Sequence, residues 1–255
     1  MTEYESSQPL AGKKAVVTGG THGMGLAIVR ALVDRGAQVV LTGRNEAGIE
    51  KARAELNPAA AHVVRSDATK SADIDELGRL VEQRLGGIDH LFVNHGVAEF
   101  KTLDEATVEH WDRVFDVNAK GAFFTVQRLA PLIRDGGSVV FTTVSNDRIF
   151  PGLSAYSAAK EAVRAFAKVL AAEMLPRNIR VNAVAPGFIL TPSMGVAELT
   201  EQQRAEFIRD GKETTPMGRP GTVDEVASAA LYLADATFTT GTELIVDGGF
   251  AQGLG

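Results

Sequence analysis

The chain has 255 residues, of which 45% are hydrophobic, and this is ample for the core of one large α/β domain. Its formal net charge of −6, without a basic cluster, argues against nucleic acid or an anionic membrane surface as a partner. Cysteine is absent, which excludes disulfides, thiolate catalysis and cysteine-ligated metals, and we predict no metal site.

The N-terminal segment, residues 1–12, is polar and acidic and has no apolar core of the kind that a signal peptide needs. No stretch of the chain approaches the roughly 18 consecutive apolar residues of a membrane-spanning helix. We therefore expect a polar tail over residues 1–12, a single domain over residues 13–255, no membrane partner and a cytoplasmic location.

Short apolar runs rich in β-branched residues recur along the chain and predict about seven strands. They lie at residues 14–19, 37–43, 61–67, 89–96, 137–143, 179–187 and 242–249. Most of these runs are continuously apolar rather than alternating, which is typical of strands buried on both faces of a parallel sheet.

Segments with helical periodicity lie between the predicted strands. The first, residues 23–36, is expected to turn Leu26, Val29, Ala31 and Val33 toward the core, and others follow at residues 71–87, 155–175, 200–210 and 222–235. The last one opens with Thr222 and Glu225, the spacing of a capping box. Strands and helices that alternate in this way predict right-handed crossovers and a doubly wound sheet with helices on both faces.

The glycine-rich segment TGGTHGMG, residues 18–25, joins the first predicted strand to the first predicted helix. Glycine permits a tight turn there and lets a pyrophosphate approach the N–H groups of a helix N-terminus. The spacing of Gly19, Gly23 and Gly25 is G-x-x-x-G-x-G rather than G-x-G-x-x-G. An ordinary strand-to-helix turn is the alternative, but the position after the first strand favours a dinucleotide site.

The end of the second predicted strand bears on the choice of cofactor. NAD-binding sheets usually carry an acid there, whereas an arginine accommodates the 2′-phosphate of NADP. This chain has Gly43 and Arg44 and no acid, and His22 in the first turn is a further phosphate donor. The sequence favours NADP(H) over NAD(H), with a solvated loop arginine as the alternative.

Tyr156 lies in the first turn of the helix predicted over residues 155–175, and Lys160 follows on the same face. A phenol has a pKa of about 10, and a nearby ammonium, a helix N-terminus and an oxidised nicotinamide would each lower it. The pair therefore predicts a general acid/base, although a surface Tyr–Lys pair has the same spacing.

These features together resemble the short-chain dehydrogenase/reductase family over essentially the whole chain. The matching motifs are TGGTHGMG at 18–25, SDAT at 66–69, NHG at 94–96, VNAKGAF at 117–123, YSAAK at 156–160, NAVAPGFILTP at 182–192 and VDGG at 246–249. The segment at 215–235 resembles the 3-oxoacyl-thioester reductase branch. The resemblance implies a Rossmann-type sheet, NAD(P)-dependent oxidoreduction of alcohols and ketones, and a homotetramer or a dimer.

The resemblance also implies a role for each matching position. Tyr156 would exchange a proton with the substrate oxygen, Lys160 would lower the pKa of Tyr156 and hold the nicotinamide ribose, and Asn118 would keep a water in a proton relay. The cofactor would be held by Tyr156 and Lys160 together with Gly19, Thr21, His22, Gly23, Met24, Gly25, Arg44, Asp67, Ala68, Asn94, Gly96, Pro186, Gly187, Ile189 and Thr191.

Three positions depart from the family pattern. His22 stands in the first turn, where the family more often has an arginine or a serine, and this difference slightly weakens the case for a 2′-phosphate. Thr143 stands thirteen residues before Tyr156, where the family usually has a serine that orients the substrate, and Ser145 is the alternative source of that hydroxyl. His95 replaces the usual small residue between Asn94 and Gly96, which favours a packed structural histidine over a cofactor contact.

The substrate pocket is expected from Thr143, Ser145, Asn146, Phe150 and Tyr156, under a lid over residues 188–217. This mixed lining fits a small ketone or secondary alcohol with a further hydrogen-bonding group. A 3-oxoacyl thioester ranks second, because residues 131–138 lack the basic cluster that reductases of acyl carrier protein substrates often carry. A catalytically silent NADP(H)-sensing module ranks third, since the proton-transfer residues are all retained.

Overall fold

Seven parallel strands form one sheet in the computed structural model, which describes residues 9–146, 151–191 and 200–254 without the side chain of Phe207. Their order across the sheet is β3-β2-β1-β4-β5-β6-β7. The strands are β1 (Lys14–Thr18), β2 (Gln38–Gly43), β3 (Ala61–Arg65), β4 (Ile88–Val93), β5 (Ile133–Thr142), β6 (Arg180–Pro186) and β7 (Glu243–Val246). The predicted doubly wound parallel sheet is confirmed.

Continuous apolar runs place the central strands in the core. Val16 of β1 pairs with Val40 of β2 on one side and with Leu91 of β4 on the other, and none of the three is accessible to solvent. Because both faces of these strands are covered, each residue of the run is buried whichever way its side chain points.

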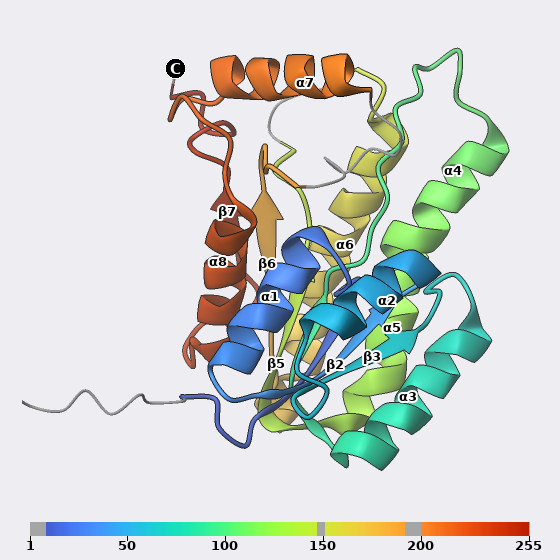
Figure 1. Cartoon of the computed structure of the whole chain (residues 1–255), viewed down its shortest axis with the longest axis vertical. Helices are drawn as coiled ribbons and strands as arrows, with labels where there is room; N and C mark the ends of the chain where they lie inside the picture. The colour runs from blue at the N-terminus through green and yellow to red at the C-terminus, as the bar shows by residue number, and fades with distance from the viewer. Residues whose placement is uncertain (1–8, 147–150, 192–199, 255) are drawn as a thin grey trace, which may run out of the picture.

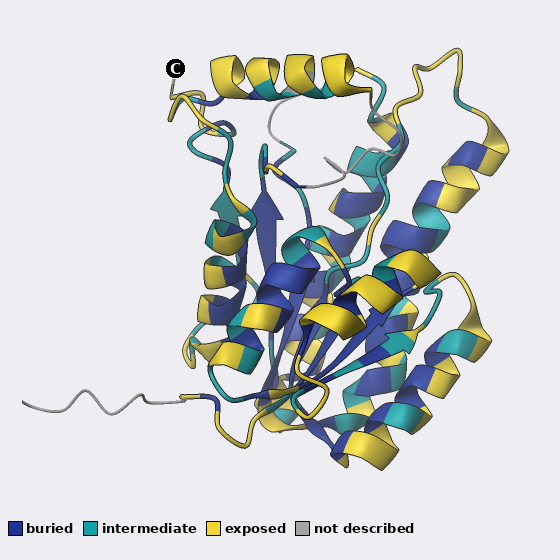
Figure 2. Cartoon of the chain, in the orientation of Figure 1, coloured by how far each residue is buried: buried dark blue, intermediate teal, exposed yellow. Residues whose placement is uncertain are grey.

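Helices cover both faces of the sheet (Figure 1). One hydrophobic cluster joins the sheet to α1 (Gly23–Asp34), α2 (Glu46–Glu55) and α8 (Val223–Asp235). A second cluster joins it to α3 (Ser71–Leu85), α5 (Gly121–Leu129) and α6 (Ser154–Glu173). Figure 2 shows the buried strands between helices whose outer faces are exposed.

Two further helices lie beyond the strand ends. Helix α4 (Val108–Phe115) packs against α6, and α7 (Glu201–Thr214) crosses the end of the molecule at the top of Figure 1. The sequence predicts α7 only as far as residue 210. The capping boxes of Thr200 with Gln203 in α7 and of Thr222 with Glu225 in α8 are both present.

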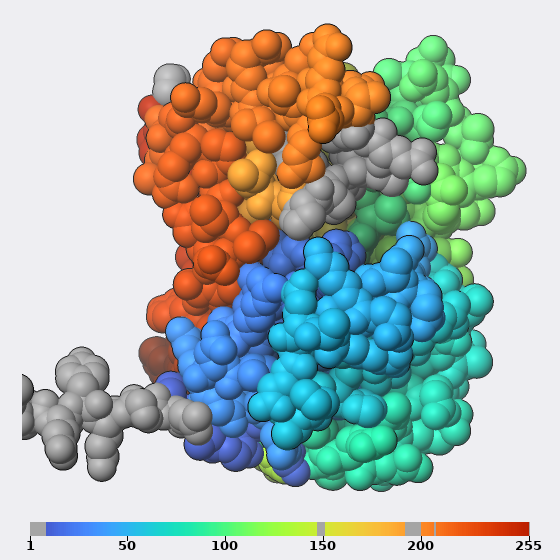
Figure 3. Space-filling view, in the orientation of Figure 1, coloured from blue at the N-terminus to red at the C-terminus, as the bar shows by residue number. Residues whose placement is uncertain are grey.

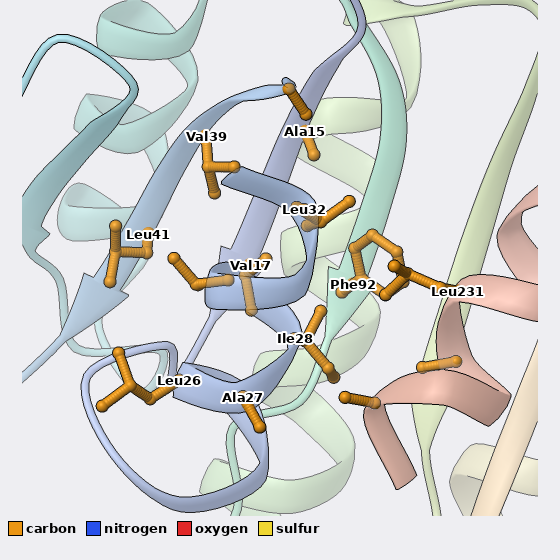
Figure 4. Close-up of a cluster of buried hydrophobic side chains, with 14 of the residues drawn as sticks. Ala15, Val17, Leu26, Ala27, Ile28, Leu32, Val39, Leu41, Phe92 and Leu231 are labelled. Atoms are coloured by element: carbon orange, nitrogen blue, oxygen red, sulfur yellow. The ribbon is translucent and has the colours of Figure 1, made fainter. Parts of the chain in front are cut away.

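Helix α1 buries Leu26 and Val29, as predicted, together with Ile28 and Leu32, which the prediction did not name. Ile28 and Leu32 are almost completely buried, whereas Ala31 and Val33 are only partly buried. Figure 4 shows Ile28 and Leu32 directed at the cluster that contains Val17, Phe92 and Leu231. Ala31 and Val33 pack against this cluster, as predicted, but they are less buried than Ile28 and Leu32.

The segment before β1 is tied to the domain as far as residue 10. Leu10 is buried, and its N–H donates to the carbonyl of Arg35 at 2.9 Å. Part of the expected polar tail thus packs on the core. Among the described residues, no helix is long and apolar enough to cross a lipid bilayer.

Candidate active site

A cavity of about 730 Å³ runs along the carboxyl ends of the strands, beside the adjacent strands β1 and β4, between which the order of the strands in the sheet reverses. Ligands of doubly wound sheets bind at this switch point. The described candidate residues line the cavity, with the exceptions of Gly25 and Asn118, which lie behind its wall. Phe150 and residues 192–199 of the expected lid lie outside the described residues.

The turn after β1 forms a cradle of backbone at one end of the cavity. Gly19 has a φ of +63°, and a Cβ on Gly25 would lie only 2.6 Å from Nδ2 of Asn94, which in turn donates to the carbonyl of Gly19 at 3.3 Å. His22 occupies the N-cap of α1 without a side-chain cap. The first-turn N–H groups are therefore available to an anion, which fits the pyrophosphate of a dinucleotide.

The part of the cavity where the sequence predicts the adenosine of a dinucleotide combines Arg44, which is exposed, with Asp67. Burial opposes the ionisation of Asp67, but the N–H and hydroxyl of Thr69, at 3.0 and 2.8 Å, and the charge of Arg44 hold its pKa below the usual value. Asp67 is thus a carboxylate at neutral pH, able to accept a hydrogen bond.

Tyr156 and Lys160 meet the cavity from the first turns of α6. Nζ of Lys160 lies 5.9 Å from the centroid of the Tyr156 ring and donates to the carbonyl of Thr142 at 2.8 Å. Burial lowers the pKa of Lys160 to about 8 and raises that of Tyr156 to about 12. The expected lowering of the phenol pKa is not seen in this structure, because desolvation outweighs the attraction of the ammonium. Tyr156 therefore carries its proton at neutral pH.

Asn118 lies in a π-helical turn, η1 (Asp116–Lys120), between α4 and α5. Its Nδ2 donates to the carbonyls of Val97 and Val114 at 2.9 and 2.8 Å, and its Oδ1 accepts from Val97 N–H at 3.1 Å. A Cβ on Gly96 would lie 2.7 Å from that Oδ1 and 3.1 Å from Nζ of Lys160. Asn118 thus holds the loop after β4 against Lys160. Turns of this kind are frequent at functional sites, but the sequence carries no signal for one.

The two candidate hydroxyls are bound to carboxylates of the β7 region. Thr143 Oγ1 lies 2.6 Å from Glu243 at the start of β7 and 3.1 Å from the Val184 carbonyl. Ser145 Oγ donates to Asp247, just beyond the end of β7, at 2.9 Å. Thr143 is therefore turned back along the sheet, whereas Ser145 lies level with the strand ends. Sequence reasoning did not identify Glu243 or Asp247, because each is about 100 residues away from its partner.

His95 is packed beside Lys160 and the end of β1. Its Nδ1 lies 2.7 Å from the hydroxyl of Thr18, and its Nε2 is buried and makes no hydrogen bond of good geometry with any residue that the structure describes. Burial and the charge of Lys160 lower the pKa of His95 to about 4, so that the ring is neutral. This geometry fits a packed structural histidine.

The loop after β6 forms the remaining wall. Gly187 N–H donates to Val246 at 3.0 Å, and Ile189 is buried in the core. Thr191 Oγ1 is buried and has no hydrogen-bonding partner within the part of the chain that the structure describes. An unpartnered hydroxyl at this point fits the polar carboxamide of a nicotinamide.

Comparison with known proteins agrees with this geometry. A family model described as enoyl-(acyl carrier protein) reductase matches residues 19–251. The solved structure of a short-chain dehydrogenase/reductase from Serratia marcescens shares 30% sequence identity, with a TM-score of 0.87 over 95% of this chain and 99% of that chain. The chain belongs to the short-chain dehydrogenase/reductase family. It is therefore an oxidoreductase of a family that uses nicotinamide cofactors.

Two named relatives span nearly the same length. An NADP-dependent (R)-specific alcohol dehydrogenase of Lentilactobacillus kefiri is 34% identical, over 94% of this chain and 97% of the relative. A D-beta-hydroxybutyrate dehydrogenase of Rhizobium meliloti is also 34% identical, over 93% of this chain and 98% of the relative. Both names describe oxidation of a hydroxyl group or the reverse reduction. The 3-oxoacyl-reductase branch is not distinguished by these matches.

Proposed function

We propose that this short-chain dehydrogenase/reductase is an NADP(H)-preferring carbonyl reductase that acts reversibly on small ketones and secondary alcohols. The observation that carries the proposal is the position of the Tyr156 phenol, which lines the cavity beside the buried ammonium of Lys160. The nicotinamide cofactor, when bound, would supply the hydride for reduction or accept it for oxidation. Tyr156 donates the proton to the carbonyl oxygen, or removes it from the alcohol.

Lys160 and Asn118 support this proton transfer. The ammonium stabilises the negative charge that forms on Tyr156 when the phenol loses its proton. Asn118 braces the loop at Gly96 against Lys160, which supports its assignment to the proton relay. The polar donors that hold the nicotinamide ribose would be Tyr156 and Lys160.

Ser145 is the better source of the hydroxyl that orients the substrate oxygen. It lies level with the strand ends. If the Ser145 hydroxyl turns from Asp247 to a substrate, the Asp247 carboxylate still accepts hydrogen bonds from the N–H groups of Gly249 and Ala251, at 2.9 and 2.7 Å. The Thr143 hydroxyl contacts Glu243, whose other oxygen lies 2.9 Å from Arg164 of α6. Thr143 thus serves the packing of β5 against β7.

Arg44 supports the preference for NADP(H). It lies at the end of β2, where the ribose 2′-phosphate would bind, and His22 lies across the cradle. The relative from Lentilactobacillus kefiri is NADP-dependent by name, which is consistent with this choice.

The substrate end of the cavity is lined by Val144, Ser145, Asn146 and Leu153 together with Phe188. Apolar walls with a few hydroxyl and amide groups favour an uncharged ketone or secondary alcohol. A 3-oxoacyl thioester remains the second candidate, supported by the resemblance at residues 215–235, and an NADP(H)-sensing module is the third.

We further propose a cytoplasmic homotetramer, with a dimer as the alternative. Exposed apolar side chains on the outer faces of α4 and α5, Trp111 and Phe124 among them, support association of like chains.

The test is consumption of NADPH and of NADH by the purified protein with small diketones, keto esters, sugars and an acetoacetyl thioester. Tyr156→Phe is measured alongside. We expect turnover with NADPH that falls at least about 100-fold in the variant, while the variant binds NADPH normally. Undiminished turnover in Tyr156→Phe would refute the mechanism. Absence of turnover in both directions, with cofactor binding intact, would favour the sensing module.

A further inference from the structure

Gly211 lies inside helix α7, where glycine is less favourable than alanine. The reason for glycine is the aromatic ring of Phe188. A Cβ at position 211 would overlap Cδ1, Cε1 and Cζ of that ring. The ring thus packs directly on the helix backbone at Gly211. We call this contact the Phe188–Gly211 socket, because the Cβ of any other amino acid at position 211 would occupy the space of the ring.

The backbone of Phe188 is fixed by hydrogen bonds to Gly221. Its carbonyl accepts from Gly221 N–H, and Leu190 N–H donates to the Gly221 carbonyl, each at 2.9 Å. The neighbouring side chain of Ile189 is buried in the core, where a Cβ on Gly221 would lie 2.6 Å from its Cδ1. The backbone of Phe188 is therefore fixed to the sheet side of the cavity, and its side chain lines that cavity.

Helix α7 has few other ties to the domain among the described residues. Near its start Arg204 donates to the carbonyl of Thr191 at 3.3 Å, and just beyond its end Thr215 packs against Gly248. Figure 3 shows the orange surface of α7 above the blue surface of the N-terminal elements that carry the cradle. The last turn of the described helix packs on Phe188 through Gly211.

We propose that the Phe188–Gly211 socket sets the height of α7 over the cavity and makes Gly211 a specificity-determining residue. This size selection rests on the proposed carbonyl reductase function. A methyl group at position 211 must move one of the two partners. The backbone of Phe188 is hydrogen-bonded to Gly221, whereas α7 has few contacts with the domain among the described residues. The helix therefore moves outward, and the room above the substrate position increases.

Whether alanine at position 211 lowers or raises the melting temperature tests the socket. Gly211→Ala is expected to lower the melting temperature. Gly48→Ala in α2 is the matched control, because a Cβ there meets nothing closer than 3.6 Å, and it is expected to raise the melting temperature. A melting temperature that rises in Gly211→Ala as well would refute the socket.

A double variant separates the socket from a general effect on α7. Phe188→Leu removes the ring, so Gly211→Ala combined with Phe188→Leu should lose less stability than the sum of the two single variants. Additive losses would contradict direct contact. Hydrogen exchange over residues 201–214 should be faster in Gly211→Ala and unchanged in Lys212→Ala, an exposed neighbour on the same helix.

Substrate size is the functional measurement. The ratio of kcat/KM for 4-phenyl-2-butanone to that for 2-butanone is expected to rise about 10-fold in Gly211→Ala and to stay constant in Lys212→Ala. An unchanged or lower ratio in Gly211→Ala would overturn the assignment of specificity. If the wild-type protein turns over no ketone or alcohol, the proposed function fails, whereas melting and exchange still decide whether the socket positions α7.

Discussion

The ammonium of Lys160 donates to the carbonyl oxygen of Thr142 at 2.8 Å and thereby ties α6 to the end of β5. The residue is only 4% exposed, and its burial lowers its pKa to about 8. Its charge is therefore maintained near neutrality at a cost in desolvation free energy. An ammonium of this kind is well placed to stabilise a transient phenolate at Tyr156.

The buried Lys160 should make stability depend on pH. Between about pH 8 and 10.5 the unfolded chain keeps a proton that the native chain has lost, so the free energy of unfolding should rise with pH in this window. The shift corresponds to about 3 kcal/mol over the whole window. Urea denaturation from pH 7.5 to 10 should show the rise in wild type and a flatter profile in Lys160→Met. Parallel profiles would contradict the burial of a charged Lys160.

Arg44 should control the choice between the two cofactors. We expect Arg44→Ala to weaken NADPH binding about 10- to 100-fold, because a charged hydrogen bond to the 2′-phosphate is lost, and to change NADH binding little. Titration of cofactor fluorescence measures both dissociation constants. Arg79→Ala, an equal loss of charge on the exposed face of α3, is the control. Equal weakening of NADPH and NADH binding in Arg44→Ala would exclude the phosphate contact.

Ser145 and Thr143 should differ in what they contribute. We expect Ser145→Ala to lower kcat/KM about 100-fold or more, through loss of a donor to the substrate oxygen. Thr143→Val should lower activity less than 10-fold but destabilise the fold by about 1–3 kcal/mol, since Glu243 loses a hydrogen bond. Steady-state kinetics and thermal unfolding of both variants give the comparison. The reverse pattern would restore Thr143 to the role that its position in the sequence predicts.

His95 should add to the loss of stability in acid. Its pKa of about 4 in the native chain lies below the 6.5 of an unfolded histidine. Between these values the unfolded chain binds a proton that the native chain does not, so stability falls as the pH falls from 6.5 to 4. His95→Asn should show a smaller loss over this range in chemical denaturation. Unchanged pH dependence would place the His95 ring in contact with solvent.

The sequence by itself determined the sheet, the glycine-rich turn after β1 and the Tyr156–Lys160 pair. Each depends on residues close together in the chain. A continuous apolar run is buried on both faces wherever its strand lies, a glycine permits a tight turn through its own backbone, and residues four apart share one face of a helix. These patterns require no knowledge of which segments become neighbours.

Only the tertiary structure decided the electrostatics of the site and the partners of its hydroxyl groups. Distant segments close around Tyr156 and remove water, which raises the pKa of its phenol, an effect that its spacing from Lys160 does not contain. Thr143 and Ser145 are distinguished by Glu243 and Asp247, which the crossover to β7 brings from about 100 residues away. The Phe188–Gly211 socket likewise depends on how α7 packs against the loop after β6. Desolvation and side-chain packing depend on which segments surround a residue in space, and order along the chain does not specify that.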